Sequence, residues 1–534
     1  MNICSVTQEN IPEFAHLSTP YIQKEYLVDG EIRQWKGNLN SVFSPIAIKT
    51  DSQYNNFIGS HPLMDETAAL ETLNAAVNAY DNGRGEWPRM TVEQRIGCVK
   101  HFVSLMKEER EIVVKLLMWE IGKSYNDSCK EFDRTIDYIN DTMEALKDLD
   151  RISSRFTIEQ GIVAQIRRAP LGVVLCMGPF NYPLNETFTT LIPALIMGNT
   201  VVVKPPKLGV LLYAPLLKAF QKAFPKGVVN TVYGRGQTVI TPIMTSGLVN
   251  VLAFIGSSRV ADVLKREQHH LHRLKCIQCL DKKNPAIVLK NADVDMAVKE
   301  CTLGALSFNG QRCTALKIIF VHNSIADQFV AKMATMIDAL KVGVPWEENV
   351  SITPLPEEGK TKAMQAMVED AVKKGARIAN KNGGIVTDTL FAPILLDNVT
   401  PDMEIYTVEQ FGPIVPVVRY ESIEEAMDYV VNSNYGQQAS LFGNNSQELA
   451  TLIDTLVNQV CRVNVNSQCQ RGPDTFPFTG RKDSAEGTLS VSDALRVFSI
   501  RTLVAAKKND SNDKIITQIV KNNESNFLNT DFIL

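Results

Sequence analysis

Short apolar runs alternate with longer amphipathic segments through the middle of the chain. The apolar runs have the length of buried strands, and the segments between them repeat their apolar residues at helical spacing. In the first series, strands are predicted at residues 171–176, 200–204, 228–232 and 249–254. Helices are predicted between them at residues 184–197, 210–223 and 238–246. Such alternation predicts right-handed crossovers and a parallel sheet.

A second series of the same kind follows. Strands are predicted at residues 286–289, 317–321 and 414–420, with helices from residue 294, at 325–340 and from residue 423. We therefore predict an α/β fold with two sheets. A Rossmann-type first domain is expected over residues 1–283 and a second α/β domain over residues 284–490.

The flanking regions predict further helices and a small β-element. Helical periodicity covers residues 67–82, 92–114 and 124–152, and residues 26–32 resemble a short hairpin. Residues of about 153–169 read as a two-stranded excursion, and residues 491–507 include a further exposed strand from residue 498. Residues 508–534 are rich in Asn, Lys and Asp, so this tail is expected to be loosely ordered.

Composition is that of an ordinary globular protein. Hydrophobic residues make up 45% and charged residues 21% of the 534 residues, and the formal net charge is −4. This balance favours neither a nucleic acid nor a membrane surface as partner, and no apolar run has the length of a membrane span. The 10 cysteines show no framework spacing, so reduced thiols in the cytoplasm are expected. Cys276 and Cys279 form an isolated CxxC, and without a second pair no metal site is expected.

Cys313 is the residue with the clearest candidate chemistry. It lies between a predicted helix and the apolar strand at residues 317–321, on a connection where reactive groups are often placed. Arg312 precedes it, and a neighbouring cation favours the thiolate, which is the nucleophilic form. A small buried hydrophobe is the alternative reading of a single cysteine.

The sequence around Cys313 is Phe-Asn-Gly-Gln-Arg-Cys-Thr-Ala-Leu-Lys, which resembles the active-site signature of the aldehyde dehydrogenase superfamily. The resemblance runs roughly from residue 63 to residue 507. It implies an aldehyde dehydrogenase-like fold in which Cys313 attacks the aldehyde carbonyl. Asn181, in the sequence Gly-Pro-Phe-Asn-Tyr-Pro, matches the asparagine that binds the oxyanion together with the backbone N–H of the cysteine.

The resemblance also implies a dinucleotide site in the first sheet. Gly256 and Ser257 match a turn that binds pyrophosphate at a helix N-terminus. Lys204 and Lys207 match a motif that holds the adenosine ribose, in which NAD-preferring members have a glutamate where this chain has Lys207. A lysine attracts a 2′-phosphate, so NADP is the expected cofactor.

A second cofactor motif follows much later in the chain. Glu409 and Phe411 stand in the sequence Glu-Gln-Phe-Gly-Pro, which is similar to the family's Glu-x-Phe-Gly-Pro. The resemblance implies that Glu409 binds the nicotinamide ribose and that Phe411 packs near the nicotinamide ring.

Four residues bear on the substrate. Residues at matching positions hold the substrate phosphate in the branch of non-phosphorylating glyceraldehyde-3-phosphate dehydrogenases; here they are Arg134, Tyr182, Arg312 and Arg471. Arginine forks suit phosphate oxygens in charge and geometry. The expected reaction is therefore the NADP-dependent oxidation of a phosphorylated aldehyde, glyceraldehyde 3-phosphate, to 3-phosphoglycerate.

The largest departure from the family concerns release of the product. Cys279 stands where hydrolytic members have the glutamate that activates water, and Asp281 is the nearest carboxylate in the sequence. Two alternatives follow from this change. One is transfer of the acyl group to coenzyme A, and the other is a scaffold that has lost hydrolysis.

The exposed strands at residues 154–168 and 498–507 bear on assembly. An unpaired strand edge tends to recruit another chain. In the superfamily the corresponding pieces join subunits, so a homodimer or homotetramer is expected.

Overall fold

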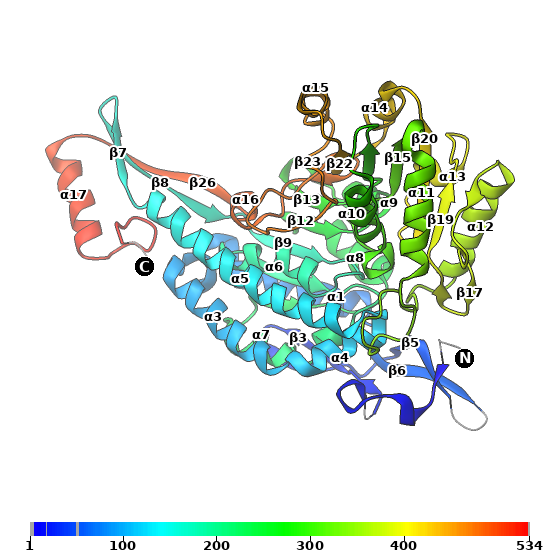
Figure 1. The fold of residues 1–534 in the computed structure, drawn as a ribbon. Coiled ribbons are helices and arrows are strands. Elements are labelled where there is room, and N and C mark those ends of the chain that lie inside the picture. Colours follow the sequence, from blue (N-terminus) through cyan, green and yellow to red (C-terminus); the bar gives the residue numbers. More distant parts are fainter. Residues whose placement is uncertain (1–4, 18, 50–52, 532–534) are drawn as a thin grey trace.

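The computed structural model describes residues 5–17, 19–49 and 53–531, and two largely parallel sheets form its centre (Figure 1). The first sheet has the strand order β11-β10-β9-β12-β13-β25. Its strands are β9 (Val173–Met177), β10 (Thr200–Lys204), β11 (Val229–Thr231), β12 (Val251–Ile255), β13 (Lys275–Cys279) and β25 (Ala485–Glu486). All pairs are parallel except that of β13 with β25. The first predicted series of strands is thus confirmed.

The second sheet has the strand order β16-β19-β20-β15-β14-β22-β23. Its strands are β14 (Pro285–Val288), β15 (Ile318–His322), β16 (Arg377–Ile378), β19 (Ile394–Asp397), β20 (Ile414–Tyr420), β22 (Gln438–Phe442) and β23 (Arg462–Val465). Only β16 runs antiparallel to its neighbour. The second predicted series is also confirmed, and the α/β fold class with it.

Helices cover both sheets. They are α1 (Glu66–Tyr80), α2 (Glu86–Arg89), α3 (Val92–Glu108), α4 (Arg110–Ile121), α5 (Tyr125–Ser153), α6 (Asn185–Ile196), α7 (Leu217–Ala223), α8 (Gly236–Thr245), α9 (Ser258–Glu267), α10 (Val294–Leu306), α11 (Asn323–Asp338), α12 (Lys360–Lys373), α13 (Glu404–Thr407), α14 (Ile423–Asn432), α15 (Ser446–Leu456), α16 (Val491–Val497) and α17 (Asp510–Lys521). Helix α6 packs on β9, β10 and β12 and is covered by α3, α5 and α16. Within the described ranges, no helix combines the length and apolarity that crossing a membrane requires.

The single helix predicted at residues 92–114 is wrong, because the structure divides it at Glu109. The residue has non-helical backbone angles, φ −95° and ψ 8°, between α3 and α4. Both helices pack on α5, but α3 also packs on α7, whereas α4 packs on β5 and the 3-10 helix Leu211–Tyr213. Tertiary packing therefore sets a break that the apolar periodicity does not reveal.

The N-terminal region holds strands that the sequence pattern missed. The predicted hairpin is confirmed as β3 (Glu25–Val28) and β4 (Glu31–Gln34), but two longer strands follow, β5 (Leu39–Lys49) and β6 (Tyr54–Pro62). Their register shifts twice, between Val42 and Phe43 and again before Ile48. Each irregularity reverses which residues face the core, so the apolar alternation is lost. The remaining short strands are β1 (Ser5–Val6), β2 (Tyr21–Ile22), β17 (Val386–Thr387), β18 (Leu390–Phe391), β21 (Tyr435–Gly436) and β24 (Arg481–Lys482).

A three-stranded antiparallel sheet extends away from the body (Figure 1). It consists of β7 (Phe156–Glu159), β8 (Ile162–Pro170) and β26 (Ser499–Lys507), so the predicted excursion and the predicted late strand pair with each other. Ile158, Ile500 and Leu503 are more than half exposed on this sheet.

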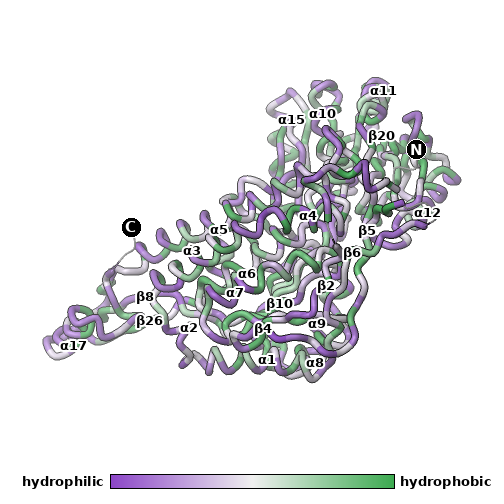
Figure 2. Tube along the Cα trace, turned by 90° about the horizontal axis from the view of Figure 1, so that it is seen from below, coloured by the Kyte–Doolittle hydropathy of each residue, from purple (hydrophilic) through white to green (hydrophobic). Residues whose placement is uncertain are grey.

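The C-terminal tail is more ordered than its composition suggested. Helix α17 runs beside this sheet, with polar and apolar residues intermixed along its turns (Figure 2). The segment after it folds back onto β8, where Arg167 Nη1 donates to Asn529 Oδ1 at 2.6 Å. Leu528 and Asn529 are buried there, so the expectation of a loose tail is wrong for this part.

Candidate active site

Cys313 lies on the tight connection between α10 and β15. Phe308, Asn309 and Gly310 all have positive φ, at 48°, 56° and 69°. A Cβ on Gly310 would come within 2.7 Å of the carbonyl oxygen of Gly412. Only glycine fits this reversal without strain, and the turn leaves the cysteine half-buried at the edge of the second sheet.

Asn284 anchors the loop that carries the cysteine. Its Nδ2 donates to the carbonyl oxygens of Cys313 and Ala315, at 3.0 and 3.2 Å, and to Gln437 Oε1 at 3.3 Å. The backbone N–H of Gln438 donates to Asn284 Oδ1 at 3.2 Å. The asparagine thus fixes the main chain at the cysteine and two residues after it.

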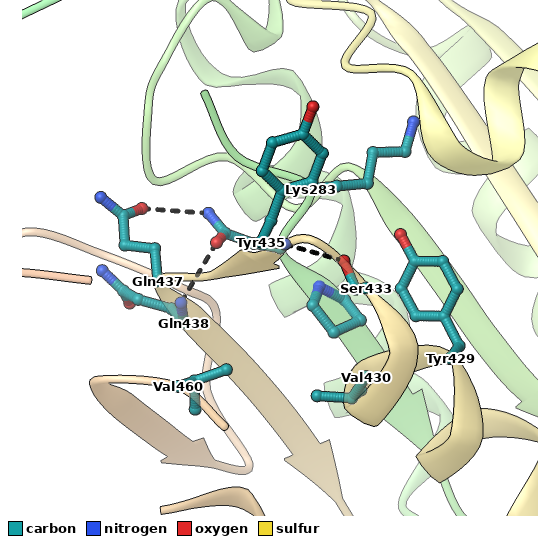
Figure 3. Close-up of a pocket in the computed structure, with 10 residues that line it drawn as sticks. Lys283, Tyr429, Val430, Ser433, Tyr435, Gln437, Gln438 and Val460 are labelled. Atoms are coloured by element: carbon teal, nitrogen blue, oxygen red, sulfur yellow. Dashed lines mark hydrogen bonds between the residues drawn. The ribbon is translucent and has the colours of Figure 1, made fainter. Parts of the chain in front are cut away.

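A small pocket of about 10 Å³ lies behind this anchor (Figure 3). It has room for about one water molecule and none for an organic substrate. Lys283, which lines it, donates to the carbonyl oxygen of Val408 at 2.7 Å and to Gln410 Oε1 at 2.8 Å. Lys283 thus ties together the segments around the small pocket, and this pocket is not the place where the substrate reacts.

The Cys279 and Cys313 thiols lie close enough for each to shift the pKa of the other. Cys279 ends β13 and is 2% exposed. Lys282, three residues later, is 4% exposed, and its positive charge lowers the pKa of both thiols. Its backbone N–H donates to Glu409 Oε2 at 3.1 Å. One short segment therefore brings a cation and a second thiol to the nucleophile.

The two thiols have opposite pKa shifts. The neighbouring Cys313 thiol lowers the pKa of Cys279 against the opposing effect of burial, and the Lys282 charge adds to the lowering. The neighbouring Cys279 thiol and burial raise the pKa of Cys313, against the lowering effect of Lys282. Since the two groups interact, the lowered pKa belongs to the pair and not to one residue.

Arg312 is not the cation beside the thiols. Its Nη2 donates to the carbonyl oxygens of Leu303 and Gly304, at 3.4 and 3.0 Å. The guanidinium is thus turned toward the end of α10, and Lys282 takes the position expected for a thiolate-stabilising cation. Sequence reasoning missed Lys282 because the direction of its side chain after β13 depends on the fold.

Asn181 lies against the cysteine loop. Its Nδ2 donates to the carbonyl oxygen of Gln311 at 2.7 Å, which leaves the second N–H of that amide for another acceptor. Lys123 Nζ in turn donates to the carbonyl oxygen of Asn181 at 2.7 Å. The position is compatible with the expected role in oxyanion binding.

The nearest carboxylate in the sequence does not face the thiols. Asp281 Oδ2 accepts hydrogen bonds from the backbone N–H of Ser258, at 2.9 Å, and from its hydroxyl. Glu186, in the first turn of α6, is 5% exposed and its charge raises the pKa of both thiols. Its Oε2 accepts from Arg471 Nη1 at 2.8 Å. No sequence motif singled out Glu186, because only the packing of α6 brings it to the site.

Two of the three arginines predicted to bind the substrate phosphate, Arg134 and Arg471, contact the same carboxylate. Arg134 binds both oxygens of Asp474, at 2.9 and 2.7 Å, across 340 positions of sequence. Arg471 Nε lies 3.3 Å from the same carboxylate, and its guanidinium stacks on Phe478 at 3.9 Å. With Glu186, the cluster holds two cations and two anions. Arg312 does not join it.

Tyr182 lies between this cluster and the body of the first domain. The ammonium of Lys123 is 3.6 Å from the centre of its ring, and the ring of Phe308 meets it edge-on at 5.8 Å. Burial raises the pKa of the Tyr182 hydroxyl, which is therefore neutral at physiological pH and can donate a hydrogen bond.

The two lysines predicted for the adenosine ribose follow β10. Lys204 is half-buried and donates to the carbonyl oxygen of Pro205 at 3.0 Å, and burial lowers its pKa to about 8. Lys207 is exposed, as a side chain that meets a 2′-phosphate at the rim of a site would be.

Glu409 and Phe411 lie together at the thiol side of the second sheet. Glu409 Oε1 is buried and has no hydrogen-bond partner among the described residues, although Lys317 Nζ lies 3.4 Å away. Such an oxygen fits a ribose hydroxyl. The rings of Phe411 and Phe180 meet edge-on, with their centres 5.8 Å apart.

Two backbone N–H groups of the predicted pyrophosphate turn already donate hydrogen bonds within the protein. Gly256 and Ser257 precede α9 as expected, but the backbone N–H of Gly256 donates to Cys279 O at 3.1 Å. The backbone N–H of Ser258 is taken by Asp281. A phosphate arriving at this helix end would meet a carboxylate, whereas Lys207 and Glu409 fit the cofactor without such a conflict.

Comparisons with known proteins agree along nearly the whole chain. Residues 48–504 match the model of the aldehyde dehydrogenase family. The NADP-dependent glyceraldehyde-3-phosphate dehydrogenase of Streptococcus equinus is 35% identical over 458 residues, which is 84% of this chain and 92% of that protein. The malonate-semialdehyde dehydrogenase of Bacillus subtilis subsp. natto is 28% identical over 489 residues, covering 89% and 98%.

The fold is shared as well. The crystal structure of the NADP-dependent glyceraldehyde-3-phosphate dehydrogenase from Bacillus halodurans in complex with NADP matches with a TM-score of 0.83 at 30% identity. The match covers 91% of this chain and 99% of that one.

Proposed function

Because this chain belongs to the aldehyde dehydrogenase family, we propose that it oxidises glyceraldehyde 3-phosphate to 3-phosphoglycerate with NADP. It is an oxidoreductase that acts on aldehydes. The observation that carries the choice of substrate is the convergence of Arg134 and Arg471, from distant segments, close to the nucleophile.

Cys313 begins the reaction. Cys279, whose pKa is lowered, accepts the Cys313 proton, and the Cys313 thiolate attacks the aldehyde carbon. The oxyanion that forms receives hydrogen bonds from the free N–H of Asn181 and from the backbone N–H of Cys313. Donors of this kind lower the barrier by roughly 3–4 kcal/mol each.

Lys207 and Glu409 would bind the cofactor for the next step, which is hydride transfer. NADP, when bound, accepts the hydride that leaves the thiohemiacetal, and Cys313 is left as a thioester. Lys207 attracts the 2′-phosphate, and Glu409 Oε1, which is paired with Lys317 but accepts no hydrogen bond from the described residues, accepts one from a ribose hydroxyl.

Recognition of the substrate phosphate rests on donors that the cluster leaves free. A guanidinium has five N–H donors, and Arg134 uses two of them on Asp474. The remaining donors of Arg134, with the neutral hydroxyl of Tyr182, suit a phosphate at the mouth of the site. Asp474 holds the fork in place for this contact.

The test compares glyceraldehyde 3-phosphate with unphosphorylated glyceraldehyde by kcat/KM. Arg134→Met should reduce kcat/KM for the phosphorylated substrate by about 10–100-fold, as loss of a charged hydrogen bond predicts, and change the other little. Arg110→Met is the matched control, because Arg110 pairs with exposed Asp133 on the outside of α5. Equal use of both aldehydes by the unmodified enzyme would rule out this substrate.

A second candidate function is favoured by Cys279. Without a glutamate at this position the thioester is open to other acceptors, so acyl transfer to coenzyme A is the alternative. The test is to add coenzyme A to the reaction. If turnover accelerates and an acyl-coenzyme A product forms, acyl transfer replaces hydrolysis as the proposed function.

A further inference from the structure

Asn181 and Tyr182 lie against an ion pair that is shielded from solvent. Lys123, between α4 and α5, and Glu131, in α5, bind each other, and both side chains are completely buried. The attraction between two buried charges often does no more than offset the cost of removing them from water. Stability alone is therefore a weak reason for such a pair, and its other contacts show what it arranges.

Lys123 contacts three residues of the site besides its carboxylate partner. Its Nζ donates to the carbonyl oxygen of Asn181 at 2.7 Å. The same ammonium lies 3.6 Å from the centre of the Tyr182 ring and 4.3 Å from that of Phe308, which are distances of cation–π contacts. One charge therefore joins the segment that carries the oxyanion amide to the turn that precedes Cys313.

Glu131 fixes the other end of the Asn181 segment. While its Oε2 binds Lys123, its Oε1 accepts from the backbone N–H groups of Leu184 and Asn185, at 3.0 and 3.1 Å. Asn185 begins α6, so the carboxylate meets N–H groups that a helix leaves free at its N-terminus. The ion pair thus holds residues 181–185 from both ends.

We propose that Lys123 is a positioning residue, which fixes the main chain at Asn181 so that its side-chain amide reaches the oxyanion, and that Glu131 holds Lys123 in place. The inference rests on the proposed function, in which this amide binds the oxyanion. Asn181 Nδ2 already donates to the carbonyl oxygen of Gln311, in the cysteine loop, at 2.7 Å. Loss of the Lys123 donor leaves the Asn181 carbonyl oxygen without this partner, and a buried acceptor that loses its donor is costly. The segment would shift, and the amide with it.

Removal of one charge or of both separates positioning from stability. Lys123→Met alone leaves the Glu131 carboxylate buried without its cation, which destabilises the fold. Lys123→Met combined with Glu131→Gln removes both charges, and the new amide oxygen can still accept from the α6 N-terminus. We therefore expect the double variant to unfold at a higher temperature than the single one, while the donor to Asn181 is missing from both.

The experiment compares the two variants with the unmodified chain by thermal unfolding and by kcat/KM for glyceraldehyde 3-phosphate and for glyceraldehyde. The kinetics are measured well below each unfolding temperature. We expect kcat/KM to fall at least about 10-fold for both aldehydes in both variants, as for a displaced reacting group, although the double variant regains stability. NADP binding, measured without aldehyde by quenching of protein fluorescence, should be unchanged, because Lys123 contacts neither Lys207 nor Glu409.

Asp150→Asn is the matched control. Asp150 and Arg167 form another buried ion pair of α5, which joins this helix to β8 in the three-stranded sheet that extends away from the body (Figure 1). The control should lower the unfolding temperature and leave kcat/KM unchanged.

Recovery of kcat/KM together with stability in the double variant would overturn the proposal, since Lys123 would then serve the fold alone. Equal use of both aldehydes by the unmodified chain would instead overturn the proposed substrate. The comparison of the variants with glyceraldehyde would still test Lys123 in that case.

Discussion

At the scale of the residue, Lys282 controls the charge of the site. It is a buried cation whose neighbours are two sulfurs and Glu409, and a buried charge needs compensation. Burial lowers the pKa of Lys282, but the charges of Cys279 and Cys313 raise it further, so the ammonium persists. The ion pair that results lies between a lysine and a thiolate.

Lys282→Met should therefore make the thiols harder to ionise. The pH midpoint for alkylation of Cys313 by iodoacetamide, compared between the variant and the unmodified protein, measures this change, since the Lys282 charge lowers the pKa of Cys313. In the variant the midpoint should rise by about one unit or more, since removing a close opposite charge has that effect. Exposed Lys290 gives the control Lys290→Met. An unchanged midpoint would show that Lys282 does not stabilise the thiolate.

Glu186 is the carboxylate best placed to activate the deacylating water. It is buried near both thiols, and one of its oxygens is held by Arg471. Glu186→Gln should lower the steady-state rate by at least about 10-fold and leave thioester formation unchanged, as the loss of a general base predicts. Asp281→Asn, whose parent side chain points to α9, should leave the rate of hydrolysis alone. The reverse ranking of these two variants would assign the water to Asp281.

At the scale of the element, the accuracy of prediction follows from what holds each element together. Strands β10 and β20 have the predicted bounds, because continuous apolar runs are buried within a parallel sheet. The break at Glu109 depends on where α3 and α4 pack, and bulges obscure β5.

The same contrast between local sequence pattern and tertiary packing explains which residues of the candidate site the sequence predicted. Family motifs placed Cys313, Asn181 and Glu409 near one another. The partners of Arg312, Lys282 and Glu186 are set by contacts between segments far apart in the chain, so no local pattern reveals them.

The N-terminus of α9 offers a prediction for this scale. Asp281 occupies the backbone donor of Ser258 and places a negative charge where a pyrophosphate is expected. Asp281→Asn should tighten NADP binding several-fold, measured by quenching of protein fluorescence on titration. Asp262→Asn, an exposed residue on the same helix, is the control. Weaker binding in the Asp281 variant would mean that the carboxylate orders the turn for the cofactor.

At the scale of the whole molecule, the three-stranded sheet is the surface that needs a partner. Ile158, Ile500 and Leu503 are 56%, 54% and 57% exposed on it. Exposed apolar side chains beside a strand edge mark an association surface. We expect a homodimer or homotetramer, which agrees with what the family resemblance implies.

Leu503→Asp should shift the mass measured by light scattering toward the monomer, because it places a charge on this surface. Val372→Asp, at an exposed position of α12, should leave the mass unchanged. A monomeric mass for the unmodified chain at working concentration would contradict the expected assembly.

The central claim is that Cys313 forms a thioester faster than this chain can hydrolyse it, because a cysteine stands at position 279. Rapid mixing of the enzyme with NADP and glyceraldehyde 3-phosphate measures this directly. The account predicts a burst of NADPH near one per active site, followed by a slower steady rate, with the acyl group on Cys313 after rapid quenching. A linear time course with no burst and no acylated Cys313 would contradict it.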